Sequence, residues 1–367
     1  MFIKSIKLIL FIFLVIFTAS TFANTPGVYV IPAVNNINGG FRVQVMADNQ
    51  GPFLCEIDTG STNFMVPGGP SVCPNCNAPV RLTPTQTMGH AFHVNYASGR
   101  KLIAHTYTTA VQAAGNSTLP PVKQTIGLIT TAAGNGNASP VLGMAQPPRK
   151  SKKGLTTYMQ ALVQAHVVRS LDFMLIGCPR SHSGTELVLG GPDPRLQNVT
   201  PQTVPLLSRQ SHYDITPVTL GVAGDPNPVG YFNPANARKD PGISVDSGSN
   251  GAIIPGRLYN PLIAVLKQSV SLPEAFWHGH GAYLSAQQIA ALPAITLTFN
   301  NNITLSIPSS SYVIPDPHNT RQSVLMIRDG RARPYTVFGD ILLSAYAVEF
   351  NRSTESLRFY SNQGLCS

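Results

Sequence analysis

Apolar and polar residues form short runs along most of this chain. Near its start, the stretches VYVIPAV (28–34) and GFRVQVMA (40–47) are typical of two strands. The chain contains 31 glycines and 31 prolines, which favour turns, whereas charged residues make up only 11% of it. We therefore predict an all-β protein with many short strands and a few short helices, for instance over residues 156–165 and 285–292.

The first residues have the layout of an export signal. Lys4 and Lys7 give a basic start, an apolar run of ten residues follows from Leu8 to Phe17, and Thr21-Phe22-Ala23 suits cleavage. Such a run is too short to span a bilayer, although an uncleaved membrane anchor is the alternative interpretation. We predict a signal peptide over residues 1–23, cleaved near Ala23, and a secreted, periplasmic or otherwise extracytoplasmic product without stable membrane insertion.

The positive charge of the chain does not point to a nucleic-acid partner. The formal net charge is +9, and two of the lysines belong to the signal segment. The excess is spread along the chain apart from one cluster at residues 149–153. A basic loop of this size is typical of a solvated surface, so we expect no nucleic-acid binding.

One acidic motif occurs twice. IDTGSTNFMVPG (57–68) and VDSGSNGAIIPG (245–256) both have an apolar residue, Asp, a small hydroxyl residue, Gly, Ser, and a Pro nine residues after the Asp. Asp58 and Asp246 are 188 residues apart. A second element repeats in step, because Gly143 follows Asp58 by 85 residues and Gly339 follows Asp246 by 93, each after two apolar residues. This repetition predicts two related lobes that each present one Asp to a shared cleft.

The paired motifs resemble those of the pepsin-like aspartic proteases, over nearly the whole mature chain. The stretch 95–99 resembles the flap hairpin of that family, 173–193 the strand pair that ends its first lobe, and 338–350 its closing segment. The resemblance implies a bilobal fold of two β-barrel-like lobes, with lobes at 24–207 and 208–367. It also implies a monomer that hydrolyses polypeptide substrates without a cofactor and binds pepstatin-type inhibitors.

The resemblance makes Asp58 and Asp246 the catalytic pair, which activates a water molecule. Two carboxyls about 3 Å apart cannot both ionise without strong repulsion, so the pair is expected to share a proton. The neighbouring residues are expected to approach the carboxylates closely, donate hydrogen bonds to them or lock the two turns together: Thr59, Gly60, Ser61, Ser247, Gly248 and Ser249.

Two residues near the first motif are expected to contact substrate. Tyr96 matches the flap tyrosine, which closes over substrate and excludes water; an ordinary strand tyrosine is the alternative. The family often has a tryptophan that bonds this tyrosine, but Met65 stands at that position here. Glu56 lies two residues before Asp58 and should share its strand face. We hypothesise that Glu56 admits Lys or Arg side chains or raises the pKa of the pair; a solvated or internally paired glutamate is the alternative.

Five cysteines in an exported chain predict two disulfides and one thiol. Cys73 and Cys76 favour a small disulfide loop over a redox or zinc pair, since no second pair completes a zinc site. Cys55 lies in an apolar strand and is expected to be the buried thiol. Cys178 and Cys366 then form the remaining pair, although connectivity does not follow from sequence alone.

Other chemistry has little support in the sequence. His278 and His280 flank a glycine in a loop and are interpreted as incidental, so no metal site is predicted. Only 34 residues separate Asn24 from Asp58, about the length that the leading strands need, so we expect no zymogen pro-segment. The rival functions are a catalytically silent protein- or inhibitor-binding member of the same fold, and a sugar- or surface-binding β-protein.

Overall fold

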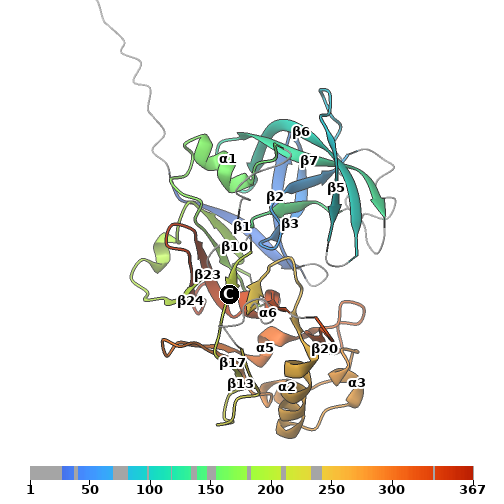
Figure 1. Cartoon of the computed structure of the whole chain (residues 1–367), viewed down its shortest axis with the longest axis vertical. Coiled ribbons are helices and arrows are strands. Elements are labelled where there is room, and N and C mark those ends of the chain that lie inside the picture. Colours follow the sequence, from blue (N-terminus) through green and yellow to red (C-terminus); the bar gives the residue numbers. More distant parts are fainter. Residues whose placement is uncertain are drawn as a thin grey trace, which may run out of the picture.

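The computed structural model describes residues 27–36, 40–68, 82–96, 99–116, 118–133, 139–146, 154–179, 183–207, 212–232, 242–333 and 335–366. Figure 1 shows two lobes joined by a central group of strands. Strands β2, β3 and β5–β7 lie in the upper lobe, β13 and β17 in the lower one, and β1, β10, β23 and β24 between them. Strands dominate and helices are short, so the predicted all-β, bilobal architecture is confirmed. The predicted signal peptide and the pair Cys73–Cys76 lie outside the described residues.

The first acidic motif is built on the strands of the upper lobe. Strand β3 (Gln50–Asp58) pairs antiparallel with β2 (Gly40–Ala47) and parallel with β8 (Val141–Gly143). Strand β4 (Phe64–Pro67) lies between β8 and β7 (Val122–Ala133). The Asp strand, the strand ending in glycine and the strand after the turn are therefore neighbours in one sheet.

The second motif repeats this arrangement in the lower lobe. Strand β15 (Ile243–Val245) pairs parallel with β22 (Thr336–Phe338). Strand β16 (Ala252–Ile254) lies between β22 and β21 (Ile327–Asp329). The sheet order β15-β22-β16-β21 thus matches β3-β8-β4-β7, and the two sequence repeats correspond to two structural repeats.

The alternation along β3 decides which of its side chains face the core. Phe53, Cys55 and Ile57 are buried in the main hydrophobic cluster. Glu56 and Asp58 project from the opposite face of the strand, because successive side chains of a strand alternate between its faces. Cys55 is a buried free thiol, as predicted.

A hairpin beside this sheet carries Tyr96. Strand β5 (Ala91–Asn95) pairs with the first residues of β6 (Lys101–Ala113), so Asn95 is opposite Lys101. Strand β6 continues along β7 over eleven paired positions. The hairpin therefore extends from a long, well-anchored strand.

The strands between the lobes come from both halves of the chain. Their order is β11 (Gln202–Pro205), β24 (Ser356–Ser361), β23 (Tyr346–Asn351), β9 (Phe173–Ile176), β10 (Glu186–Leu189) and β1 (Tyr29–Asn36). The predicted disulfide between Cys178 and Cys366 is present and joins residues 188 positions apart beside this sheet. The predicted boundary between residues 207 and 208 stays a prediction, because residues 208–211 are outside the described part.

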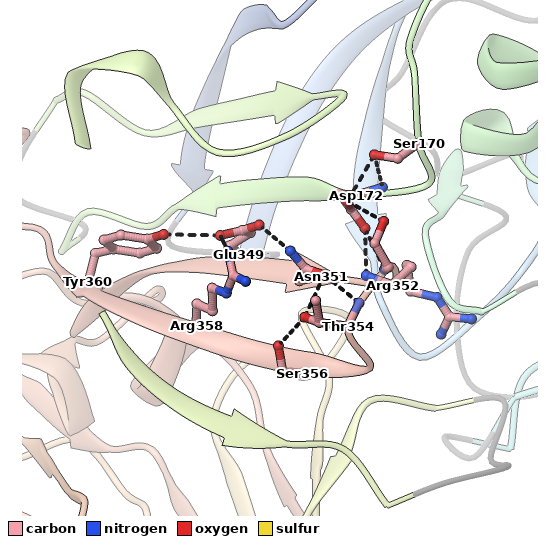
Figure 2. Close-up of polar contacts among 10 residues, drawn as sticks. Ser170, Asp172, Glu349, Asn351, Arg352, Thr354, Ser356, Arg358 and Tyr360 are labelled. Carbon is pink, nitrogen blue, oxygen red and sulfur yellow. Dashed lines mark hydrogen bonds and ion pairs between the residues drawn. The ribbon is translucent and has the colours of Figure 1, made fainter. Parts of the chain in front are cut away.

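Two buried carboxylates stabilise this central sheet (Figure 2). The carboxylate of Asp172 accepts hydrogen bonds from the main-chain N–H groups of Arg352 and Ser353, at 2.6 Å and 3.0 Å. The carboxylate of Glu349, which is 0% exposed, accepts bonds from Asn351 Nδ2 at 2.7 Å and from the Tyr360 hydroxyl at 3.0 Å. Each acid is thus satisfied by several donors, which offsets part of the cost of burying it.

The two helices predicted from the sequence are present and are capped as their sequences indicate. Helix α1 (Tyr158–Gln164) begins after Thr157, and α4 (Ala286–Ala290) begins after Ser285; both have a reciprocal capping box. A longer helix, α2 (Gly256–Ser269), was not predicted; it contains Pro261, a residue that usually ends helices.

The remaining elements complete the second lobe and its connections. They are the helices α3 (Glu274–Trp277), α5 (Ser309–Tyr312), α6 (Asp340–Leu343), the 3-10 turn η1 (Pro194–Leu196), and the strands β12 (Asp214–Ile215), β13 (Thr219–Val222), β14 (Gly230–Tyr231), β17 (Ile295–Thr298), β18 (Thr304–Ile307), β19 (Val313–Pro315) and β20 (Ser323–Leu325). No helix in the described ranges is long and apolar enough to cross a membrane.

Candidate active site

Asp58 and Asp246 meet where the two lobes join. Asp58 is the last residue of β3, and Asp246 directly follows β15. A Cβ added to Gly60 would lie 2.5 Å from Oδ1 of Asp246, and a Cβ added to Gly248 would lie 2.5 Å from Oδ1 of Asp58. Each turn therefore packs directly against the carboxylate of the other, and only glycine leaves room for this approach.

Main-chain N–H groups hold both carboxylates in place. Gly60 N–H donates to Oδ1 of Asp58, and Gly248 N–H donates to Oδ1 of Asp246, both at 2.9 Å. The Ser61 hydroxyl adds a bond of 2.5 Å to Oδ2 of Asp58. The matching hydroxyl bond expected from Ser249 is absent within the described residues. Asp58 thus has one more hydrogen-bond donor than Asp246.

The electrostatic surroundings of Asp246 favour its protonated form. Burial away from water raises the pKa of the Asp246 carboxyl, and the neighbouring Asp58 carboxylate raises it further. The bond from Gly248 N–H opposes this shift without cancelling it. The pair therefore has one carboxyl with extra donors and another whose ionisation is disfavoured.

Thr59 and Ser247 lock the two turns together. Thr59 N–H donates to the Ser247 hydroxyl at 3.0 Å, and Ser247 N–H donates to the Thr59 hydroxyl at 2.9 Å. The Thr59 hydroxyl donates to the Val245 carbonyl at 3.0 Å, and that of Ser247 to the Ile57 carbonyl at 2.6 Å. Thr59 and Ser247 are both 0% exposed, so these four bonds are shielded from competing water.

Tyr96 is held at the tip of its hairpin by Arg100. Tyr96 N–H donates to the Arg100 carbonyl at 2.9 Å, and the Arg100 guanidinium lies 4.1 Å from the centroid of the tyrosine ring. Burial raises the pKa of Tyr96 to about 12. Met65, which replaces the family tryptophan, is buried in the apolar cluster against which Tyr96 packs. The sequence interpretation missed Arg100, although its place four residues after Tyr96 in a hairpin was a usable signal.

Glu56 lies on the same face of β3 as Asp58, as expected. Burial raises the pKa of Glu56 to about 7, and the Asp58 carboxylate contributes to this rise. The guanidinium groups of Arg100 and Arg42 oppose it. Arg42 is directly opposite Glu56 on the neighbouring strand. The Asp340 carboxylate adds a smaller rise, so Glu56 is placed among two cations and two anions, beside the pair.

Two pockets are lined by Asp246, and Asp58 is in the lining of neither. One, of about 450 Å³, is lined by Gly60 and Ser61, by hairpin residues 94–96, and by Asp214 and Asp246. The other, of about 680 Å³, shares Asp246 but extends along the lower lobe. The hairpin of Tyr96 thus borders a cavity whose floor carries Asp246, a geometry suited to holding an extended chain over the carboxyls.

His278 and His280, which were interpreted as incidental, lie outside the two pockets at Asp246. His278 and His280 line a third pocket, of about 1010 Å³, which contains neither acidic residue of the pair. His278 Nε2 lies 3.2 Å from Glu274 Oε1. The described residues contain no cluster of three or more His, Cys, Asp or Glu side chains that could hold a metal ion.

Comparisons with known proteins agree with this geometry. Residues 43–361 match the family described as eukaryotic aspartyl protease. Pepsin A of Gallus gallus is 24% identical over 322 residues, which cover 84% of this chain and 80% of that protein. Gastricsin of Macaca fuscata fuscata is 23% identical over 320 residues (84% and 79%), and an aspartic protease of Phaffia rhodozyma is 24% identical over 273 residues (71% and 61%). The chain belongs to the pepsin-like family of eukaryotic aspartyl proteases and is an aspartic endopeptidase.

Proposed function

We propose that Asp58 and Asp246 are the catalytic pair of this endopeptidase and that its substrates are polypeptides. The observation that carries the proposal is the reciprocal packing of the two turns, in which Gly60 contacts Asp246 and Gly248 contacts Asp58. This packing brings two carboxyls from opposite halves of the chain to one point of a cleft. Such a pair can both accept and donate a proton, which is what direct attack by water on a peptide bond requires.

The different surroundings of the two carboxyls suggest their roles. Asp58, which accepts bonds from Gly60 N–H and the Ser61 hydroxyl, is the base that takes a proton from the attacking water. Asp246, whose pKa is raised, carries the shared proton and donates it to the carbonyl oxygen of the substrate. The water oxygen bonds to the carbonyl carbon. Asp58 then passes the proton that it took from water to the amide nitrogen, and one hydroxyl of the tetrahedral intermediate returns a proton to Asp246. The C–N bond breaks, which leaves a carboxylic acid and an amine.

Tyr96 and Arg100 form the mobile cover of the site in this proposal. A hairpin that closes over the bound peptide excludes bulk water and strengthens the electrostatic interactions at the pair. Stacking of Arg100 on the Tyr96 ring, at 4.1 Å, keeps the ring in one orientation in place of the absent tryptophan.

Glu56 is proposed to adjust the pair. Its carboxylate raises the pKa of Asp246, so it extends the pH range over which the pair keeps its proton. Alternatively, Glu56 acts on specificity and admits a Lys or Arg side chain of the substrate. Profiling of the cleavage products of Glu56→Leu decides between them, because an unchanged profile and an unchanged pH dependence would refute both.

We also propose that the protein is secreted. The basic start, the ten-residue apolar run and the small residues before Asn24 support export and cleavage near Ala23. Sequencing the N-terminus of the exported protein tests this, and a product that starts at Met1 would contradict it.

Hydrolysis of denatured haemoglobin or casein between pH 3 and 7, with and without pepstatin, tests the proposed function. We expect hydrolysis that pepstatin abolishes. A folded protein that is inert at every pH would instead favour a binding protein on the same fold.

A further inference from the structure

The pocket of about 680 Å³ begins at Asp246, one member of the proposed catalytic pair, and runs along the lower lobe. Asp246, Gly248 and Ser249 form its inner end, and Tyr335 and Val337 line both this pocket and the one beneath the hairpin. A peptide lying across the pair can therefore place a side chain into it. What chemistry the pocket accepts depends on the side chains along its outer part.

Three arginines line that outer part. Arg328 belongs to β21, and Arg331 and Arg333 follow in the turn that leads toward β22. All three side chains are exposed. None of the three guanidinium groups forms an ion pair with a carboxylate of the described residues, so their charges are available to a ligand.

The main chain of this turn is fixed, which keeps the arginines beside the pocket. Arg331 N–H donates to Oδ1 of Asp329 at 2.7 Å, and the Arg331 carbonyl accepts a bond from Gly256 N–H at 3.0 Å. Arg333 N–H donates to the Gly330 carbonyl at 3.1 Å, and its guanidinium lies 6.0 Å from the ring centroid of Tyr335. A pre-set backbone lowers the entropic cost of engaging a ligand.

The charge of the pocket is positive. Of the acids that face it, Asp329 already accepts the bond from Arg331 N–H, and Asp246 belongs to the pair that shares a proton. Three guanidinium groups therefore outnumber the negative charges there. Arginine presents several N–H donors in a planar fork that matches the two oxygens of a carboxylate.

We propose that Arg328, Arg331 and Arg333 form a specificity subsite that takes the acidic side chain of a polypeptide substrate, so that the enzyme prefers Asp or Glu close to the cut bond. This proposal rests on the proposed function, because it assumes that a peptide lies across Asp58 and Asp246. It extends that function by naming the class of substrate residue that this chain selects.

Peptide pairs test the subsite. Each pair carries Glu or its uncharged isostere Gln at one position, and the position is moved in turn along both sides of the cut bond. At pH 5.5 we expect one position at which kcat/KM for the Glu peptide exceeds that for the Gln peptide by about 1.5-fold to fivefold, the range that solvent-exposed ion pairs support. The double variant Arg331→Gln, Arg333→Gln should bring this ratio close to one, and Arg328→Gln should lower it.

The matched control is Arg321→Gln, since Arg321 is an exposed arginine of the same lobe that does not line this pocket. Its Glu-to-Gln ratio should equal that of the parent. The ratio of the parent should also fall toward one below about pH 4, where a peptide Glu becomes neutral while guanidinium groups stay charged. A ratio near one at every position, in a parent enzyme that cuts both peptides, overturns the proposal and leaves the proposed function intact.

A binding measurement separates the two proposals if hydrolysis fails. Asp58→Asn retains the arginines, and fluorescence anisotropy with labelled Glu and Gln peptides reports their Kd values without cleavage. We expect Asp58→Asn to bind the Glu peptide more tightly than the Gln peptide. This difference should disappear when Arg331→Gln and Arg333→Gln are added to Asp58→Asn. That result supports the subsite even if the enzyme cuts neither peptide. Equal Kd values for the two peptides, in a variant whose thermal unfolding matches the parent, contradict it.

Discussion

Thr59 and Ser247 each donate a main-chain N–H to the hydroxyl of the other, at 3.0 Å and 2.9 Å. They are 188 residues apart in sequence and fully buried. The exchange joins the two turns that carry Asp58 and Asp246, so the position of one acid depends on the position of the other. The separation of the carboxyls is therefore set by main-chain bonds across the lobe boundary, and it does not depend on the flexibility of either lobe alone.

Replacing Ser247 with alanine should loosen this junction. The Ser247 hydroxyl donates to the Ile57 carbonyl at 2.6 Å and accepts from Thr59 N–H, and both main-chain groups would lose a buried partner. We expect the free energy of unfolding to fall by about 1–3 kcal/mol in urea titrations. Ser271→Ala, at an exposed serine, is the control. A loss no larger than that of the control would show that the exchange contributes little.

Adding one methyl group at Gly248 should impair catalysis more than folding. The new Cβ would lie 2.5 Å from Oδ1 of Asp58, so the carboxylate must move. A shift of about 1 Å in a reacting group can lower kcat on the order of 100-fold. Gly27→Ala serves as the control, since its Cβ would meet nothing closer than 3.5 Å. Full activity of Gly248→Ala in steady-state assays would mean that the turn can relax around the extra atoms.

The Glu56→Gln variant should lose activity at a lower pH than the parent. The active pair holds one proton, which is released as the pH rises through the raised pKa of Asp246. A charged Glu56 raises the pKa of Asp246. Removing the Glu56 charge therefore lowers the pKa of Asp246 and moves the alkaline limb of the kcat/KM profile toward lower pH. The acidic limb should move little, because Glu56, with a pKa of about 7, is already neutral there. Coinciding alkaline limbs would remove Glu56 from the electrostatics of the site.

Glu56 should also affect how stability depends on pH. Its pKa is raised from 4.5 to about 7 by folding, so the folded chain holds this proton where the unfolded chain has released it. The stabilising contribution of Glu56 to the free energy of unfolding is full below about pH 4.5 and is lost as the pH rises through about 7. Urea titrations at a series of pH values should show a shallower decline in Glu56→Gln than in the parent. The control is Glu355→Gln, at an exposed glutamate, whose stability should decline with pH as steeply as that of the parent. An equally steep decline in Glu56→Gln would contradict this prediction.

The central sheet makes a separate prediction about Glu349. Glu349→Ala would leave Asn351 Nδ2 and the Tyr360 hydroxyl without their buried acceptor and would open a cavity. We expect a loss of about 2–4 kcal/mol in the free energy of unfolding and a smaller loss in Glu349→Gln. Activity per folded molecule should be retained, because Glu349 lines neither pocket at the pair. Equal stability of Glu349→Ala and the parent would contradict the role assigned to these bonds.

The paired motifs revealed most of the site from sequence because their chemistry is local. An Asp that ends an apolar strand, followed by a hydroxyl residue and glycine, specifies a turn whose N–H groups face a carboxylate, and its repetition indicated the second half. The predicted helices α1 and α4 also begin with local bonds, because Thr157 and Ser285 each bond a glutamine three residues later. Interactions within a few residues can be predicted in this way.

Features that depend on distant neighbours were less accessible. Helix α2 forms despite Pro261 because its apolar face, with Leu258, Leu262 and Leu266, is buried by tertiary packing. The stacking of Arg100 on Tyr96 and the gathering of arginines along one pocket depend on how hairpins and turns are folded against the site. Among the described residues Ser249 makes no hydroxyl bond to match that of Ser61, which shows that equal motifs can have unequal surroundings.

The most direct test of the shared catalytic pair is a comparison of Asp58→Asn, Asp246→Asn and the double variant in one peptide-hydrolysis assay. Because the two carboxyls act as a unit, each single variant should lose as much kcat/KM as the double variant, several orders of magnitude, with unfolding midpoints that confirm folding. Substantial activity in either folded single variant would contradict the claim that Asp58 and Asp246 work as one proton-sharing pair.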